Sequence, residues 1–165
     1  KSPQHLEQMG PLMKVFPDAS VVVTHRDPLS VIQSAATMYS YSARLRERKI
    51  EPQRHLNYWA DRIEHLLRSS LRDRHLLPAE KTTDVLYQNL IADDVAEVQQ
   101  IYSAANFELN PGALKQMHHY KEGHARGRYG RVIYDMRADF GVEPERLRER
   151  FKFYFDAFPV EHEVL

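Results

Sequence analysis

A run of three valines, Val21 to Val23, constrains the fold most strongly, because it leads directly into a helix start. A strand of this composition offers no polar face to solvent and is typical of a parallel sheet covered on both sides. Asp27 and Pro28 then have the pattern of an N-cap followed by proline at the first helical position. The sequence therefore predicts a buried strand that ends at Arg26, immediately before a helix.

Long helical segments separate this strand from a second strand candidate, Asp84 to Tyr87. Apolar residues at helical spacing predict helices over residues 5–16, after Pro28, over about 52–75, after Asp93-Asp94, after Asn110-Pro111 and from about Glu143. The helix after Pro28 carries Val31, Ile32, Ala35, Met38, Tyr39 and Leu45 on one side, and the helix over 52–75 carries Leu56, Trp59, Ile63, Leu66, Leu67 and Leu71. Two buried-type strands joined by helices indicate a helix-rich α/β fold with a parallel sheet.

A sheet of two strands is too small to stand alone, because three or more are usually required. The chain also opens on "KSPQHL" without an initiator Met. We therefore expect residues 1–165 to be one domain that forms the C-terminal portion of a larger one.

The composition limits the possible functions. The formal net charge is zero, which disfavours general nucleic-acid or membrane-surface binding, since those functions need a net basic field. There are no cysteines, so disulfides, zinc ribbons and thiol nucleophiles are excluded. No apolar run reaches membrane-spanning length, and we expect a cytoplasmic protein.

The junction after the valine strand has the features of an anion site. Ligands of open α/β sheets bind beyond the carboxyl ends of the strands, where Arg26 lies. Its guanidinium can contact a phosphate through two hydrogen bonds, and the following helix adds a positive dipole end. Ser30 and Ser34 lie four residues apart on one face of that helix. In the alternative interpretation, Arg26 only pairs with Asp27 or another acid and the serines are solvated.

The segment "VVTHRDPLSVIQS" resembles the 3'-phosphate-binding segment of sulfotransferases that use 3'-phosphoadenosine 5'-phosphosulfate (PAPS). In that family a Ser eight residues after the Arg completes the phosphate site, and Arg26 and Ser34 match this spacing. "KSPQHL", "VLYQNLIADD" and "HARGRYGRVIYDMRADFGVEPERLRERFKFYFDAF" resemble further segments of the family's bacterial branch. The resemblance implies a P-loop-like α/β fold, whose first strand and phosphosulfate loop have no counterpart in this chain.

The resemblance also implies roles for other residues. The family transfers a sulfonate from PAPS to a hydroxyl or amine of a small-molecule, glycan or lipid acceptor. His5 is the candidate base, although it lies two residues later than the base of the best-known cytosolic members, and Lys1 is a candidate to stabilise developing charge. Tyr87 corresponds to a tyrosine that borders the adenine. Arg126, Gly127 and Arg128 are candidates for a loop over the 3'-phosphate.

Simpler interpretations remain open for each of these residues. His5 is otherwise a helix-entry histidine, Tyr87 a core tyrosine, and the Arg126–Arg128 segment a solvated basic loop. The nine histidines fit no standard zinc spacing, and we predict no metal site. The alternative function is a non-catalytic nucleotide-binding or helical interaction domain with the same fold.

Overall fold

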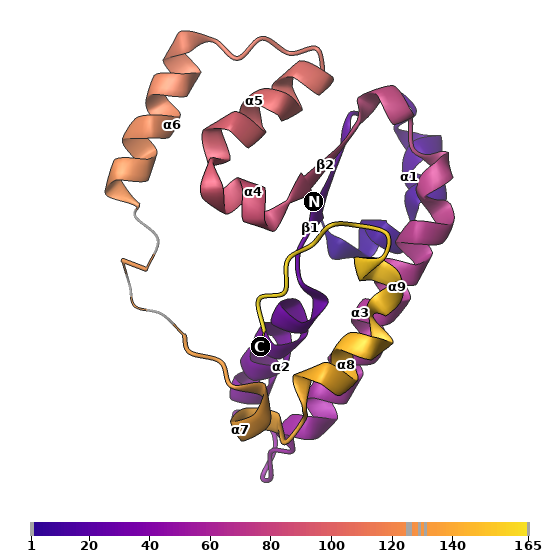
Figure 1. Ribbon diagram of the computed structural model, residues 1–165, viewed down its shortest axis with the longest axis vertical. Coiled ribbons are helices and arrows are strands. Elements are labelled where there is room, and N and C mark those ends of the chain that lie inside the picture. The colour runs from indigo at the N-terminus through magenta and orange to yellow at the C-terminus, as the bar shows by residue number, and fades with distance from the viewer. Residues whose placement is uncertain (1, 125–126, 129, 131, 165) are drawn as a thin grey trace.

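The computed structural model describes residues 2–124, 127–128, 130 and 132–164. Figure 1 shows a small central sheet with helices around it and the chain ends near its middle. The elements in chain order are η1 (Pro3–Glu7), α1 (Met9–Val15), β1 (Val21–His25), α2 (Pro28–Ala43), α3 (Pro52–Asp73), η2 (Arg74–Leu76), η3 (Ala79–Lys81), β2 (Thr82–Leu86), α4 (Tyr87–Ala92), α5 (Asp94–Ala104), α6 (Pro111–Gly123), α7 (Met136–Phe140), α8 (Pro144–Arg150) and α9 (Lys152–Phe155).

The two strands pair in parallel, with Val21 opposite Thr82 and His25 opposite Leu86. The connection between them contains α2 and α3, as a parallel pair requires. The predicted helix-rich α/β fold is thereby confirmed. Strand β2 begins two residues earlier than expected, and Tyr87 is the first residue of α4 rather than the last residue of the strand. Both strands end at the same edge of the sheet, where α2 and α4 begin.

Helix α2 begins as the sequence predicts. The Asp27 carboxylate accepts a hydrogen bond from the Leu29 backbone N–H at 2.9 Å, and Pro28 occupies the first turn. The side expected from its apolar residues is only partly the buried one. Ile32 is buried as expected, but Met38 is 67% exposed, and the structure buries Leu29 and Ala36 instead. Apolar residues lie on more than one side of this helix, so their spacing alone does not identify the side that faces the core.

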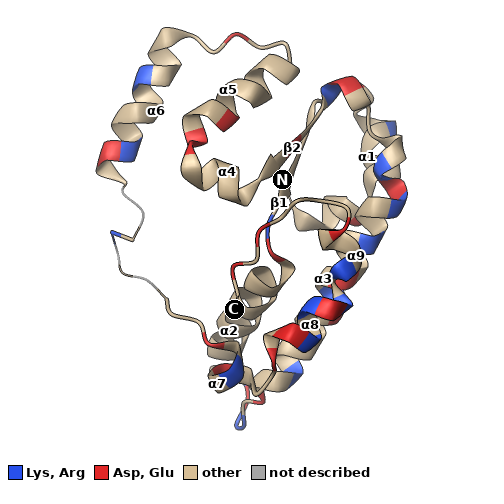
Figure 2. Ribbon diagram, in the orientation of Figure 1, with Lys and Arg blue, Asp and Glu red and all other residues tan. Residues whose placement is uncertain are grey.

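Helix α3 matches the predicted segment closely. Leu56 and Leu66 are buried, and Trp59, Ile63 and Leu67 pack against the core that contains Leu56. Trp59 lies edge-on to the Tyr39 ring of α2, with the two ring centroids 6.2 Å apart, and its indole N–H is buried without a partner among the described residues. The outer side of α3 is charged with both signs, as is the adjacent α8 (Figure 2). Arg150 of α8 bridges to Asp61 and Glu64 of α3, which ties the two helices together.

The C-terminal part folds differently from the single helix expected after Glu143. Instead, α8 and α9 are separate, and the unpredicted α7 precedes them. Gly141 ends α7 with φ 66°, a left-handed conformation that favours glycine. The main core gathers buried residues of α2, α3, α7 and α8, of the α8–α9 junction and of residues 159–164: Leu29, Ile32, Ala36, Leu56, Ala60, Met136, Phe140, Leu147, Phe151 and Val164.

The N-terminal segment also differs from the continuous helix expected over residues 5–16. It forms the 3-10 helix η1 and then α1, which begins at Met9. Gly10 and Pro11 therefore occupy the first turn of α1, where a proline costs no hydrogen bond.

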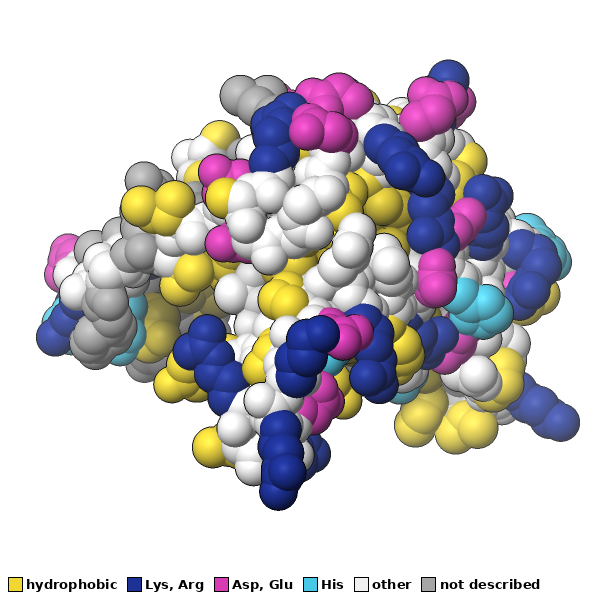
Figure 3. Space-filling view, turned by 90° about the horizontal axis from the view of Figure 1, so that it is seen from below, with side chains coloured by type: hydrophobic (Ala, Val, Ile, Leu, Met, Phe, Trp, Pro, Cys, Tyr) yellow, Lys and Arg dark blue, Asp and Glu magenta, His cyan; other side chains and the backbone are white. Residues whose placement is uncertain are grey.

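Helices α4, α5 and α6 form an arm that contacts the rest mainly through β2, and α6 buries none of its described residues (Figure 1). Seen from below, the molecule shows basic, acidic and hydrophobic side chains interspersed, without a field of one sign on this face (Figure 3). None of the described helices is both long and apolar enough to cross a membrane.

Candidate functional site

His25, the last residue of β1, fixes the strand end from two sides. Its Nε2 is 2.7 Å from an Asp84 carboxylate oxygen of β2, and its Nδ1 is 2.8 Å from the Tyr154 hydroxyl of α9. Arg74 pairs with the same Asp84 carboxylate, and the Phe158 ring lies 4.0 Å from the imidazole, centroid to centroid. The backbone at Arg26, one residue further on, is therefore held by β2 and α9 together.

Burial decides the charge of this histidine. It lowers the pKa of His25, although the Asp84 carboxylate acts in the opposite direction. A neutral ring donates from Nε2 to the carboxylate and accepts at Nδ1 from the tyrosine. Burial also raises the pKa of the Tyr154 hydroxyl, which therefore keeps the proton that it donates. The His25 network is thus a structural hydrogen-bond network at neutral pH.

Asp27 ties the C-terminal segment, residues 159–164, to the same junction. One carboxylate oxygen caps α2, and the other accepts from the backbone N–H groups of Glu163, at 2.7 Å, and Val164, at 3.2 Å. Val164 is buried in the main core, and its carbonyl accepts from Arg148. Gln88 of α4 donates to the Pro159 carbonyl at 2.6 Å. This segment is therefore anchored at both ends.

Arg26 lies at the centre of the junction. Its Nε and Nη2 donate to the two carboxylate oxygens of Glu163, at 2.7 and 2.6 Å. Its guanidinium carbon lies 4.0 Å from the centroid of the Tyr87 ring. The hydrogen bonds to Glu163 raise the pKa of Arg26 above its ordinary value. Part of the alternative interpretation is thus correct: Arg26 pairs with an acid, although that acid is Glu163 and not Asp27.

The Glu163 carboxylate uses only one edge of the guanidinium. The Nη1 atom of Arg26 donates to none of the described residues, and the side chain is 37% exposed. A guanidinium edge of this kind can donate to an oxyanion.

The two candidate serines differ in their surroundings. Ser30 is buried, and its hydroxyl donates to Glu163 at 3.4 Å. Ser34, one helical turn further along, is half-buried and its hydroxyl lies 3.2 Å from that of Tyr134. Ser34 therefore lies where α2 meets the segment that follows the glycine- and arginine-rich residues, a contact that the sequence did not predict.

A cavity of about 270 Å³ opens next to Arg26, between α4 and the C-terminal segment. Its lining is Tyr87, Gln88, Ile91, Glu161, His162 and Glu163. Tyr87, which the resemblance assigns to the adenine, thus combines a position in this cavity with its contact to Arg26.

Of the other predicted residues, His5 belongs to η1, which packs against α3 rather than at this junction. His5 is exposed in η1, and its side chain makes no hydrogen bond or ion pair with the described residues. Gly127 and Arg128 form a turn, and Arg128 donates to the Gly123 carbonyl. Lys1 and Arg126 lie outside the described residues.

Glu163 and His25 are the site residues that sequence reasoning missed. Glu163 is 137 positions from Arg26, and no local pattern connects the two. His25 had a usable signal, since a histidine that continues a strand of buried valines needs partners for both ring nitrogens.

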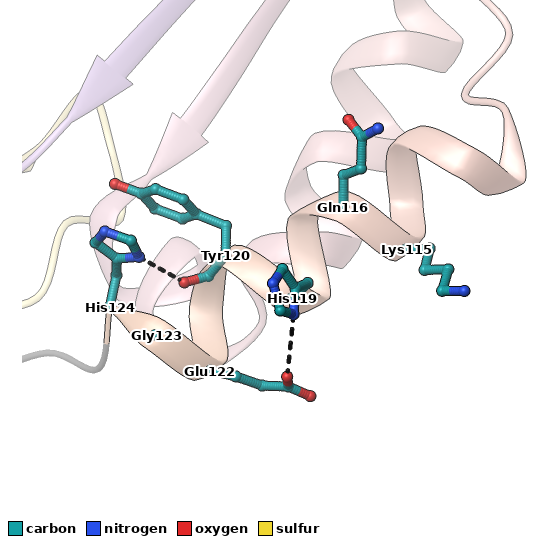
Figure 4. A pocket seen from close by; sticks show the side chains of 7 residues that line it. All are labelled: Lys115, Gln116, His119, Tyr120, Glu122, Gly123 and His124. Atoms are coloured by element: carbon teal, nitrogen blue, oxygen red, sulfur yellow. Dashed lines mark hydrogen bonds and ion pairs between the residues drawn. The ribbon is translucent and has the colours of Figure 1, made fainter.

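A larger cavity, of about 510 Å³, lies along α6 (Figure 4). All its lining residues belong to this helix and its C-cap: Lys115, Gln116, His119, Tyr120, Glu122, Gly123 and His124. The rings of Tyr120 and His124 stack with centroids 3.8 Å apart. This hollow therefore lies on the surface of one helix. Within the part of the chain that the structure describes, no three His, Asp or Glu side chains are grouped to hold a metal ion.

Fold and junction together define an α/β protein in which a buried strand leads through Arg26 directly into a helix. The chain belongs to the sulfotransferase family, whose family model matches residues 1–111. The family predicted from the sequence is thereby confirmed.

Two solved structures are similar to the chain. One is the sulfotransferase STF9 from Mycobacterium avium, with a TM-score of 0.86 and 23% identity over 100% of this chain. The other is the sulfotransferase STF1 from Mycobacterium tuberculosis H37Rv, with a TM-score of 0.75 and 26% identity over 92% of this chain. The chain spans 42% and 38% of their lengths, respectively. No curated protein matches the chain significantly.

Proposed function

We propose that this chain is the C-terminal portion of a PAPS-dependent sulfotransferase domain in which Arg26 and Ser34 bind the 3'-phosphate of the donor. The observation that carries the proposal is the position of Arg26, at the carboxyl end of β1 and directly before α2. A phosphate at this point gains charge-assisted hydrogen bonds from Nη1 and the favourable end of the α2 dipole. Membership of the sulfotransferase family supports the same assignment.

The residues present fit the 3'-phosphate and adenosine part of such a donor. Arg26 offers an unused donor edge, Ser34 a hydroxyl on the adjoining helix face, and Tyr87 an aromatic ring at the neighbouring cavity. We assign Arg126, Gly127 and Arg128 to a loop that closes over the 3'-phosphate, on the resemblance alone. PAPS, when bound, supplies the activated sulfonate, and the residues of this chain hold and orient its nucleotide.

His5 is the proposed general base, which takes the proton of the acceptor hydroxyl or amine. Lys1 is proposed to stabilise charge on the leaving nucleotide. Replacing His5 by Ala should abolish sulfonate transfer while leaving binding of adenosine 3',5'-bisphosphate intact. Transfer at the wild-type rate would remove His5 from the mechanism.

The donor site is tested by calorimetric titration of the protein that contains this chain with adenosine 3',5'-bisphosphate and with 5'-AMP. We expect the bisphosphate to bind more tightly. Arg26→Ala should weaken it roughly 10- to 100-fold, because hydrogen bonds to charged groups contribute about 1.5–3 kcal/mol, and it should leave 5'-AMP unaffected. The control is Arg44→Ala, which removes a positive charge at the far end of α2.

Two results would contradict the proposal. Equal affinity for the two nucleotides in the wild type would show that no 3'-phosphate site exists. Equal losses in Arg26→Ala and Arg44→Ala would show that general electrostatics, rather than a local site, attracts the nucleotide. Either result would favour a non-catalytic domain with the sulfotransferase fold.

A further inference from the structure

The Glu163 carboxylate is bound to Arg26, the same residue that we propose to bind the donor's 3'-phosphate. Two explanations of this pairing are possible. Either the carboxylate occupies the phosphate position and must leave, or it holds Arg26 in a fixed orientation and stays. The surroundings of Glu163 distinguish these explanations.

The backbone around Glu163 is fixed independently of Arg26. Asp27, fully buried, accepts from the N–H groups of Glu163 and Val164. Val164 is in the main core, and Arg148 donates to its carbonyl. Moving the backbone of Glu163 away would break these contacts and leave a buried carboxylate of Asp27 with fewer donors, which is costly. The carboxylate can therefore leave Arg26 only by rotation of its own side chain, which would give up the two hydrogen bonds from Arg26 and the one from Ser30. These contacts favour a carboxylate that stays.

The geometry of the pair leaves the other edge of Arg26 available. Glu163 accepts from Nε and Nη2, Tyr87 covers one face of the guanidinium, and the Ser30 hydroxyl supports the carboxylate from α2. Nη1 and the second hydrogen of Nη2 remain for a ligand. Without Glu163, the Arg26 side chain would be flexible and would have to be ordered when the ligand binds. The conformational entropy lost in that step lowers the affinity.

We infer that Glu163 is a positioning residue, which fixes the Arg26 guanidinium so that its Nη1 edge recognises the 3'-phosphate. The inference rests on the proposed donor site and extends it. Glu163 itself does not touch the 3'-phosphate; it acts on the phosphate through Arg26, with Ser30 and Asp27 holding it in place. Selectivity for a 3'-phosphorylated nucleotide then depends on an acid in the C-terminal segment.

The test is the ratio of affinities for adenosine 3',5'-bisphosphate and 5'-AMP in Glu163→Gln. Gln keeps the size of the side chain but places an N–H donor against the guanidinium, so the two-fold hydrogen bonding is lost. We expect the bisphosphate to bind about tenfold more weakly, the order expected for one arginine left to be ordered on binding. Binding of 5'-AMP and the melting temperature should change little, and Glu163→Asp should recover part of the loss.

The matched control is Glu108→Gln, which removes an exposed negative charge between α5 and α6. If Glu163→Gln binds the bisphosphate as well as or better than the wild type, the inference is wrong; tighter binding would identify the carboxylate as a competitor of the phosphate. If the wild type itself does not prefer the bisphosphate, both the donor-site proposal and the inference about Glu163 are wrong. Failure of the inference alone appears only in Glu163→Gln, so the two cases are distinguishable.

A measurement without ligand checks the same inference. The Nε–H of Arg26 should give a resolved NMR signal with slow solvent exchange in the wild type, because it donates to Glu163. In Glu163→Gln this exchange should accelerate. An unchanged signal would show that Glu163 does not orient Arg26.

Discussion

Ser34 lies one helical turn beyond Ser30 on α2, with its hydroxyl 3.2 Å from that of Tyr134. Ser30 donates its one hydroxyl proton to the Glu163 carboxylate. Ser34 can instead accept from the Tyr134 hydroxyl and keep its own proton for a ligand. We therefore propose Ser34 as the binding serine and Ser30 as the serine that supports Glu163.

We expect Ser34→Ala to weaken binding of adenosine 3',5'-bisphosphate about three- to tenfold, since a hydrogen bond contributes about 0.5–1.5 kcal/mol. The affinity for 5'-AMP should not change. Ser42→Ala, at the exposed C-terminal end of α2, is the control in the same titration. A Ser34 variant that retains full affinity would remove this residue from the site.

At the scale of the elements, the His25 network joins β1, β2 and α9 immediately before the site. Because burial lowers the pKa of His25, the folded protein keeps this ring neutral at pH values where the unfolded chain binds a proton. The stabilisation is thus complete above the ordinary histidine value of 6.5 and is lost as the pH falls through the folded value. Protonation would also place an N–H at Nδ1, facing the hydroxyl that now donates to it.

We therefore expect the free energy of unfolding to decrease as the pH is lowered from 7 towards 5, measured by urea denaturation with circular dichroism. The variant His25→Gln should be less stable at pH 7 but should depend less on pH across this range. Asp84 and Arg74 are the charged groups of this network, and neither changes in the variant. Equal pH dependence of the two proteins would show that His25 is not the titrating group.

At the scale of the whole molecule, stability is distributed unevenly. The main core lies between α2, α3, α7 and α8, whereas α6 buries none of its described residues. Phe151→Ala removes a fully buried ring and should destabilise the protein by about 3–5 kcal/mol. Tyr120→Ala on α6, whose ring is 63% exposed, should change stability by less than about 0.5 kcal/mol. Similar losses in the two variants, in the same urea titration, would contradict this distribution.

Features that depend on neighbouring residues were predictable from the sequence. The valine run, the Asp27-Pro28 helix start and the position of Arg26 between them all follow local rules, and the structure has them where they were expected. The parallel pairing of the two strands was predictable, because two buried strands joined by a long helical connection can form few other topologies.

Features that depend on distant residues were not predictable. The partner of Arg26 lies in the C-terminal segment, 137 positions away. The side of α2 that is buried depends on where α3, α7 and α8 pack against it, and not on the apolar pattern of α2 alone. Helix α7 has only five residues, too few for an apolar period to be recognised. The single helix expected after Glu143 is divided into two, because Phe151 ends α8 and precedes α9.

The single tryptophan gives the molecule an intrinsic spectroscopic reporter. Trp59 lies between α2 and α3, edge-on to Tyr39 and Tyr58, and not in the junction around Arg26. Its fluorescence should therefore change sharply when the helices separate and little when a nucleotide binds. Tryptophan fluorescence can accordingly follow folding at any nucleotide concentration, without attaching a dye.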